Sequence, residues 1–451
     1  MNVPKDGDVY DCIIVGTGSA GATLARELSA NGCRVLMLER GEHRQLKETL
    51  WESVSILNEV KVAPRLKDPR VFAAGGSTAM YLAVADDPPL DAFRAVGIDL
   101  EEDYAVAQRE LPLAETPDDL LSPQTVRLRD AALAEGLRWS KNRMLIDRSR
   151  CGGGYDYSAK WKALAFVEEA IGNGAELQCD AIVERILIED GVAIGVECRI
   201  SNPSFGSRIA RFHARKIVVC AGSLATPVIL RKSGFDEAVS GGYFIDPSVA
   251  VIGSVPGLRG TNGFAGTMGA TLEDGTRLLD ANVHQFYFNM GMVQSLRPWR
   301  IRDFGQHVSI MIKAHDEVGG RLSADGRYHK DIDAEAMARL ASGLGTAKRI
   351  LARAGARALI TTPLMTGGAF GTIRLGRDVD AGLQTRIRNL HVCDGSLVPA
   401  EARVAPTLTL VCLAKYLARH LLSDPEVRAP TLTGPHGPDV SIHTTSGAKA
   451  A

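Results

Sequence analysis

The chain has 451 residues, of which 45% are apolar and 23% are charged, and this profile is typical of a soluble globular protein. The 52 Lys and Arg residues against 53 Asp and Glu residues leave a formal charge of −1, which gives no electrostatic footprint for nucleic acid or for an anionic membrane surface. No window approaches 18 consecutive apolar residues, so we expect no membrane-spanning helix.

The first fifty residues carry a clear local pattern. Tyr10–Val15 reads as a buried strand, the turn Gly16–Gly21 follows at once, and Ala22–Asn31 has the apolar spacing of a helix. A second buried strand, Arg34–Leu38, ends at the acidic residue Glu39. This order of strand, glycine turn, helix, strand and acid is the dinucleotide-binding fingerprint, and it predicts a nucleotide cofactor.

Each glycine of the turn has a predicted role. Gly16 permits the tight turn, Gly18 lets a pyrophosphate approach the backbone, and Gly21 allows close packing of helix on strand. The N-terminus of the helix would face the phosphates with free N–H groups, and Glu39 would accept hydrogen bonds from a ribose diol. The expected cofactor-binding residues of this region are Gly16, Thr17, Gly18, Ser19, Ala20, Gly21, Glu39 and Arg40.

The middle of the chain alternates between helical and strand-like patterns. A second glycine turn lies within Val71–Tyr81, where an ordinary loop is the plainer interpretation. The next predicted elements are a helix over 161–171, strands over 176–179, 182–189, 193–199 and 216–220, and a helix over 226–233.

The rest of the chain is first rich in strands and then in helices. Val283–Met290 and His307–Lys313 are the clearest strands, and the alternation places His284, Phe286 and Phe288 on one face. The pattern then predicts a helix over 333–354, a strand over 389–393 and a strongly apolar helix over 407–422.

The predicted fold class is α/β with a mixed α+β character, and its nucleotide-binding segments are discontinuous. Residues 1–90, 150–235 and 370–422 would form a Rossmann-like cofactor-binding domain. Residues 91–149 and 236–369 would form a substrate domain on a mixed or antiparallel sheet, and 424–451 a disordered tail.

Three further motifs carry a resemblance to a known family. They are Gly75–Tyr81 (GGSTAMY), Ile217–Gly234 (IVVCAGSLATPVILRKSG) and Leu390–Leu417 (LHVCDGSLVPAEARVAPTLTLVCLAKYL). In this order they resemble the glucose–methanol–choline (GMC) oxidoreductases, which are FAD enzymes, and the resemblance covers most of residues 8–422. It implies FAD as the cofactor and oxidation of an alcohol. It also implies cofactor contacts from Gly75, Gly76, Ser77, Val183, Ala221, Gly222, Asp394, Gly395, Ala405, Thr407 and Leu408.

The chain departs from the family pattern where the acid and base would lie. Gly368 stands at the position of the usual active-site His, and Ala405 at that of its His or Asn partner. The flanking Gly371-Thr372 and Pro406-Thr407 fix the register of both positions, and neither side chain can accept a proton. Tyr81 replaces the Asn that usually ends the second glycine turn.

Tyr81 and His284 are the candidate catalytic residues in place of the missing pair. His307 and His315 lie in the same predicted domain as His284, and for all three histidines a satisfied structural role is the plainer interpretation. A packed core aromatic is the corresponding alternative for Tyr81.

The resulting hypothesis is an FAD-dependent oxidoreductase that acts on a small or medium organic alcohol or a related donor. The alternatives are a lyase, a photodecarboxylase-like enzyme, or a flavin-binding protein without turnover. The electron acceptor stays open among oxygen, a quinone and a carrier protein. The scattered cysteines, with no C-x-x-C pair, predict reduced thiols, no metal site and a cytoplasmic protein.

Overall fold

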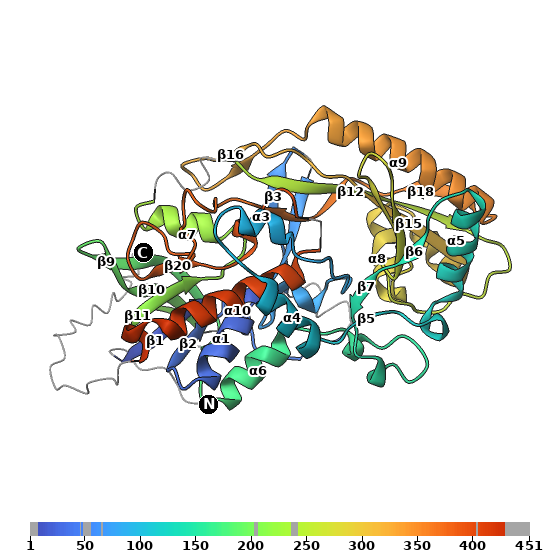
Figure 1. Ribbon diagram of the computed structural model, residues 1–451. Helices are drawn as coiled ribbons and strands as arrows, with labels where there is room; N and C mark the ends of the chain where they lie inside the picture. The colour runs from blue at the N-terminus through green and yellow to red at the C-terminus, as the bar shows by residue number, and fades with distance from the viewer. Residues whose placement is uncertain are drawn as a thin grey trace, which may run out of the picture.

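The computed structural model describes residues 8–45, 47, 56–64, 66–202, 206–235, 242–402 and 405–428. Two seven-stranded sheets, each covered by helices, lie side by side along the long axis of the molecule (Figure 1). Within the described residues, no helix is long and apolar enough to cross a membrane.

The first sheet is parallel at its centre and antiparallel at one edge. Its long strand β11 (Gly206–Val219) pairs in parallel with β1 and β20 through its second half and antiparallel with β10 through its first half. The spatial order is β8 (Glu176–Gln178), β2 (Val35–Leu38), β1 (Val9–Val15), β11, β10 (Val192–Asn202) and β9 (Ala181–Glu189), with β20 (Leu390–Val392) on β11.

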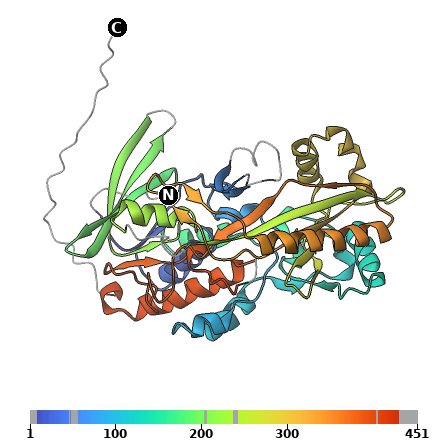
Figure 2. The ribbon, with the colours of Figure 1, turned by 90° about the horizontal axis from the view of Figure 1, so that it is seen from above.

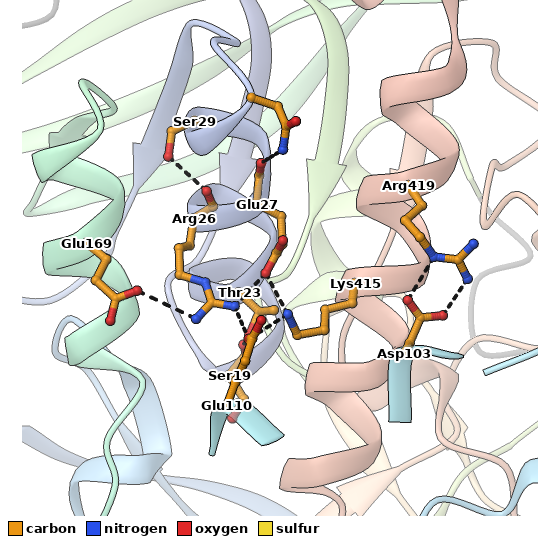
Figure 3. A network of polar contacts seen from close by, with 11 residues as sticks. Ser19, Thr23, Arg26, Glu27, Ser29, Asp103, Glu110, Glu169, Lys415 and Arg419 are labelled. Atoms are coloured by element: carbon orange, nitrogen blue, oxygen red, sulfur yellow. Dashed lines mark hydrogen bonds and ion pairs between the residues drawn. The ribbon is translucent and has the colours of Figure 1, made fainter. Parts of the chain in front are cut away.

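Helices α1 (Ser19–Ala30), α6 (Leu164–Gly172) and α10 (Thr407–Ser423) pack side by side below this sheet (Figure 1). A polar network ties α1 and α10 to their neighbours (Figure 3). Lys415 of α10 contacts Glu27 and Glu110 at 2.7 Å each, and Arg26 of α1 reaches Glu110 at 2.5 Å. The shared Glu110 ends α4 (Glu101–Glu110), so three helices meet at one carboxylate.

The second sheet is antiparallel, and its two faces carry different layers. Val251 of β12 (Phe244–Ser254) faces the core formed with α5 (Pro123–Ala134) and α9 (Ala334–Arg353), whereas Ile252 faces α8 (Gln285–Gln294). The spatial order is β18 (Arg357–Thr361), β12, β15 (His307–Lys313), β14 (Arg277–Asp280), β13 (Met268–Thr271) and β6 (Ser140–Lys141), with β19 (Met365–Phe370) on β12.

The hairpin of β3 (Leu57–Ala63) and β4 (Leu66–Val71) connects the two halves, because β4 packs on β19. The remaining elements are short: α3 (Leu90–Arg94), β5 (Leu113–Glu115), β7 (Arg143–Leu145), α7 (Thr226–Lys232), β16 (Arg321–Leu322), β17 (Tyr328–His329), α11 (Pro425–Arg428), and the 3-10 helices η1 (Gly76–Ala79), η2 (Asp118–Leu120), η3 (Arg148–Arg150), η4 (Tyr157–Ala159), η5 (Pro298–Gln306) and η6 (Gly395–Leu397).

The mixed α/β fold class is therefore as predicted, and among the described residues each large sheet has its own main hydrophobic core. The domain boundaries stay a prediction. Residues of α3 and α4 lie within the predicted substrate segment 91–149 but pack into the core of the first sheet, where Arg419 of α10 binds Asp103 at 2.7 Å. Of the predicted tail, the described part begins with α11, and residues 429–451 lie outside the described residues.

One predicted strand is wrong. Residues 283–290 do not form a strand, because the chain turns into α8 at Gln285. The His284 Nδ1 accepts a hydrogen bond from the Phe286 N–H at 3.2 Å and so caps the helix. Phe288 and Met292, four residues apart, are both buried on one helix face. His284, Phe286 and Phe288 thus do not share a strand face.

Candidate functional site

The first glycine turn connects β1 to α1, and its geometry requires two of its glycines. Gly16 has a φ of +98°, and a Cβ there would lie 2.4 Å from the Cys220 carbonyl oxygen. A Cβ on Gly21 would lie 2.0 Å from the Gly16 carbonyl oxygen. Gly18 differs, since a Cβ there would meet no described atom within 4 Å. The protein itself therefore explains Gly16 and Gly21 but leaves the space beside Gly18 open.

The N-terminus of α1 has no side-chain cap and no acidic residue in its first turn. The first intrahelical bond runs from the Ala22 N–H to the Gly18 carbonyl at 2.9 Å, so the N–H groups of Ser19, Ala20 and Gly21 precede it. Uncapped N–H groups and the positive end of the helix dipole suit a phosphate. The turn therefore fits the pyrophosphate of a dinucleotide.

Glu39 is fully buried beside this turn, at the end of β2. Its carboxylate accepts hydrogen bonds from the Thr17 N–H at 3.0 Å, the Thr17 hydroxyl at 2.6 Å and the Gly41 N–H at 2.9 Å. Burial raises the pKa of Glu39, while these donors oppose the shift. The next residue, Arg40, stacks on the Phe72 ring at 4.1 Å, and burial lowers its pKa.

The second glycine turn packs directly on the first. A Cβ on Gly76 would lie 3.0 Å from the Gly18 Cα, and Gly75 and Gly76 have φ values of +88° and +57°. Ser77 follows within η1, and the Thr78 hydroxyl donates to the Gly75 carbonyl at 2.6 Å. Two turns that are far apart in the sequence thus form one backbone surface, with the opening at Gly18 between them.

Asp394 joins two further motifs. Its carboxylate accepts hydrogen bonds from the Gly222 N–H and the Ser396 N–H at 2.8 Å each, and from the Thr226 hydroxyl. The turn after β11, which holds Ala221 and Gly222, is thereby fixed to the end of β20. A Cβ on Gly395 would lie 2.9 Å from the Ser223 hydroxyl oxygen, so the two segments approach each other closely.

Val183 and the N-terminus of α10 complete the predicted cofactor residues. Val183 is buried in β9, two residues from Ala181, whose N–H donates to the Glu39 carbonyl at 2.9 Å. Helix α10 starts at Thr407 and Leu408 after Pro406, again with no side-chain cap and no acidic residue in its first turn. Val183 therefore lies close to the Glu39 segment. The start of α10 presents helix N–H groups that no side chain caps.

The position of the family histidine is covered by an aromatic ring. A Cβ on Gly368 of β19 would lie 2.4 Å from Cζ of Phe370, and a Cβ on Gly395 would lie 3.3 Å from the same ring. The Phe370 and Phe244 rings lie 5.7 Å apart, and His315 lies 5.1 Å beyond Phe244. Burial lowers the pKa of His315, and the Arg339 charge lowers it further.

The partner position, Ala405, is held through its backbone. Its N–H donates to an oxygen of Asp86 at 3.1 Å, and the same oxygen accepts from Arg277 at 2.5 Å. Residues 403 and 404, just before it, lie outside the described residues.

Buried charges behind β19 were missed by sequence reasoning. Asp246 of β12 accepts from the Gly367 N–H at 2.8 Å and binds Lys313 of β15 at 2.6 Å. Asp68 of β4 binds Arg70 at 2.5 Å and accepts from the backbone of Ala369. Burial raises the pKa of Asp68 to about 6, partly opposed by Arg70. Two carboxylates thus hold the strand on either side of Gly368. The polar residues within the otherwise apolar segment 243–253 were the available signal.

Tyr81 and His284 contact different residues of the segment 155–161. The Tyr81 hydroxyl donates to the Trp161 carbonyl at 2.5 Å, and burial raises its pKa well above the usual value. The His284 ring lies 5.4 Å from the Tyr155 ring. His307 is buried between Phe288 and Phe304, where burial lowers its pKa to about 4. His307 therefore has the environment of a structural histidine.

The chain belongs to the GMC oxidoreductase family. The family model for GMC oxidoreductases matches residues 10–250, which is more than half of the sequence. The family prediction is confirmed, and with it an oxidoreductase that acts on alcohol-like donors and uses FAD. The uncapped helix N-terminus and the open space at Gly18 fit that cofactor.

Several known proteins are similar to this chain. An uncharacterised protein of Methanocaldococcus jannaschii is 25% identical over 92% of this chain and 100% of its own length. The long-chain-alcohol oxidase FAO3 of Arabidopsis thaliana is 22% identical over 77% of this chain, which spans about half (53%) of that protein. The crystal structure of pyridoxine 4-oxidase from Mesorbium loti has a TM-score of 0.69 at 18% identity, covering 91% of this chain and 99% of the other. The last similarity shows the fold.

Proposed function

We propose that the protein oxidises a small or medium organic alcohol, with acid and base groups other than the family pair. The observation that carries this proposal is the packing of the glycine turn at residues 75–76 on the turn at 16–21. Close to them, the Asp394 carboxylate accepts a hydrogen bond from the Gly222 N–H. The similar proteins named for oxidation of pyridoxine and of long-chain alcohols support the substrate class.

The cofactor contacts that we propose follow from the turns. The N–H groups at the start of α1 and the backbone of Gly18 and Gly76 would bind the pyrophosphate, and Glu39 the ribose. The N-terminus of α10 would favour negative charge on the flavin ring. When bound, FAD supplies the acceptor for the hydride that leaves the substrate carbon.

The proton of the alcohol must go to a group other than residues 368 and 405. We propose Tyr81 and His284 as candidates with distinct roles. Because its pKa is raised, Tyr81 would stay protonated, and because its single proton is donated to the Trp161 carbonyl, its oxygen would accept a hydrogen bond from the substrate hydroxyl. Because the His284 Nδ1 accepts from a backbone N–H, the proton of the neutral ring is on Nε2. With its Nε2 protonated, His284 would orient a substrate oxygen by donating to it, and a bound water would take the proton of the alcohol.

An anaerobic titration of the FAD-loaded protein tests the proposal. We expect at least one member of a panel containing pyridoxine, a long-chain primary alcohol and short primary alcohols to bleach the oxidised flavin band. Reoxidation by oxygen or by a quinone would then identify the electron acceptor. A spectrum that no alcohol changes, with full FAD occupancy, would contradict the proposal.

A non-oxidative function is the second candidate, and the Phe370 ring over Gly368 favours it. Apolar atoms there neither accept the substrate proton nor stabilise its charge. The same titration separates the two, because a lyase or a photodecarboxylase-like enzyme would turn over a ligand without net reduction of the flavin.

A further inference from the structure

Helices α8 and η5 form a lobe between β14 and β15 that stands out from the second sheet (Figure 2). Its inner side is well packed, since Phe288 and Met292 are buried against Ile252 of β12. Arg300 anchors it further by donating to the Ala358 carbonyl at 2.6 Å. The lobe is therefore held firmly on the body of the protein.

The lobe also exposes large apolar side chains. Val293, Leu296 and Trp299 are 54%, 82% and 59% exposed, within seven consecutive residues. We call these three residues the lobe tip. In the rest of the described chain, the large exposed apolar side chains are separated in sequence: Val9, Leu133, Ile209, Val318 and Met337. Single exposed apolar residues are ordinary on a protein surface, whereas a group of them marks an interaction site.

The backbone presents the tip in an unusual way. Leu296 has a φ of +57°, a left-handed conformation that favours Gly or Asn at such a turn. The Arg297 N–H donates to the Met292 carbonyl at 2.8 Å and closes the turn. A leucine thus occupies a strained turn position and directs its side chain to solvent, where folding gains little from it.

The charged residues of the segment 293–302 are all arginines. Arg297 and Arg302 are exposed beside it, whereas the nearby Asp303 binds the buried Arg300 at 2.8 Å. A protruding Leu–Trp tip beside arginines suits an anionic lipid surface, into which apolar side chains insert while the cations bind headgroups. A protein partner would bury a broader patch than this turn offers.

We propose that the lobe tip binds the protein reversibly to an anionic lipid bilayer. The net charge of −1 describes the whole molecule and does not exclude such binding. The exposed Arg297 and Arg302 give this segment a local positive charge. The bilayer would receive Leu296 and Trp299 at the depth of the headgroups, and no part of the lobe would cross it.

Sedimentation of the FAD-loaded protein with vesicles tests this proposal. We expect binding to vesicles of phosphatidylcholine and phosphatidylserine in equal parts, and much weaker binding to phosphatidylcholine alone. The double variant Leu296→Ser/Trp299→Ser should bind at least about tenfold more weakly, because each side chain loses its transfer into the apolar layer. Arg297→Gln/Arg302→Gln should lose the preference for anionic lipid.

Met337→Ser is the matched control, since it removes an exposed apolar side chain from α9 and should leave binding unchanged. All variants should keep the FAD content of the wild type. The proposal is wrong if the wild type binds neither vesicle, or if the serine variant binds as well as the wild type. It is also wrong if the serine variant instead changes the oligomeric state without lipid, which would identify a protein interface.

Discussion

Gly18 and Gly21 lie in the same turn but have different surroundings. The packing of the protein requires Gly21, whereas Gly18 is open toward the proposed cofactor. Gly21 has no room for a side chain, because a Cβ there would lie 2.0 Å from the Gly16 carbonyl oxygen. Gly18 faces open space on the protein side, where a Cβ would meet nothing within 4 Å. A methyl group at position 21 would therefore disturb the fold, whereas one at position 18 would meet no protein atom and could disturb a ligand.

We predict that Gly21→Ala lowers the free energy of unfolding by about 2 kcal/mol or more, because its Cβ would overlap the Gly16 carbonyl. Gly18→Ala should leave the stability of the apoprotein within about 0.5 kcal/mol of wild type and still reduce FAD binding. Thermal unfolding of both apoproteins and titration with FAD check this pair. Wild-type FAD affinity in Gly18→Ala would exclude the turn as the pyrophosphate site.

The Phe370 ring occupies the space into which a restored family histidine would extend. Gly368→His alone should destabilise the protein by about 1–3 kcal/mol, because its Cβ would overlap the Phe370 ring. Adding Phe370→Ala would remove the overlap, although it also removes packing on Phe244, and Ala405→Asn would then complete the family pair. We expect faster flavin reduction by alcohols in the triple variant than in the wild type. An unchanged rate at full FAD content would show that the pocket lacks more than its base.

The buried carboxyl of Asp68 predicts a pH dependence. Its folded-state pKa of about 6 lies above the usual 3.8, so the folded protein binds more protons than the unfolded chain between these values. The contribution of Asp68 to stability is therefore greatest below about pH 4 and falls as the pH rises through about 6. Asp68→Asn should flatten this part of the stability curve in urea unfolding. A slope equal to that of the wild type would contradict the raised pKa.

Sequence reasoning succeeded at single residues where one local demand decides the residue type. Gly16 and Gly21 are required by a turn that the surrounding strand and helix already define. The grouping of Asp68, Asp246 and Lys313 could not be predicted, because these residues lie on three strands far apart in the chain and meet only in the folded structure. The Phe370 ring over Gly368 depends on side-chain packing in the same way.

At the scale of elements, helix α10 is fixed to α1 and α4 by ion pairs as well as by apolar packing. Lys415 is nearly buried between Glu27 and Glu110 (Figure 3), whereas Lys67 and Glu59 form an exposed pair on the β3–β4 hairpin. The environments of the two lysines thus differ in burial, although each makes contacts of similar length with carboxylates.

We predict that Lys415→Met lowers the free energy of unfolding by about 1–3 kcal/mol, because two partly buried carboxylates lose a charged donor. Lys67→Met is the matched control and should change it by less than about 0.5 kcal/mol, since exposed ion pairs contribute little. Denaturant unfolding at low salt measures both. Equal effects of the two substitutions would contradict the role given to the α1–α10 network.

Apolar periodicity predicted the long helix α10 well. It failed at residues 283–290, where the same pattern fits a strand or a helix. The run over 407–422 is long enough to be read as a helix, and α10 spans Thr407–Ser423. The alternation over 283–290 fits a strand, but the His284 cap and the packing of Phe288 and Met292 on Ile252 select a helix. That selection depends on β12, which is distant in sequence, so the pattern could not reveal it.

At the scale of the whole molecule, the proposed cofactor-binding surface is assembled from separate segments of the chain. The turns at 16–21, 221–222 and 394–395 are brought together by β1, β11 and β20, which are adjacent in one sheet, and the turn at 75–77 packs on the first of them. The second sheet meets this surface through β19 and the β3–β4 hairpin. The family motifs predicted which segments come together. They did not predict that α4 packs on α10, because the two helices are distant in the sequence.

Hydrogen exchange of the apoprotein, measured by mass spectrometry before and after FAD is added, tests this assembly most directly. If the separate turns form one cofactor site, FAD should slow amide exchange together in peptides containing residues 16–21, 75–79, 221–226, 394–397 and 407–410. Peptides from the α8–η5 lobe should change little. Protection confined to the first turn, with the other four segments exchanging as in the apoprotein, would contradict the account.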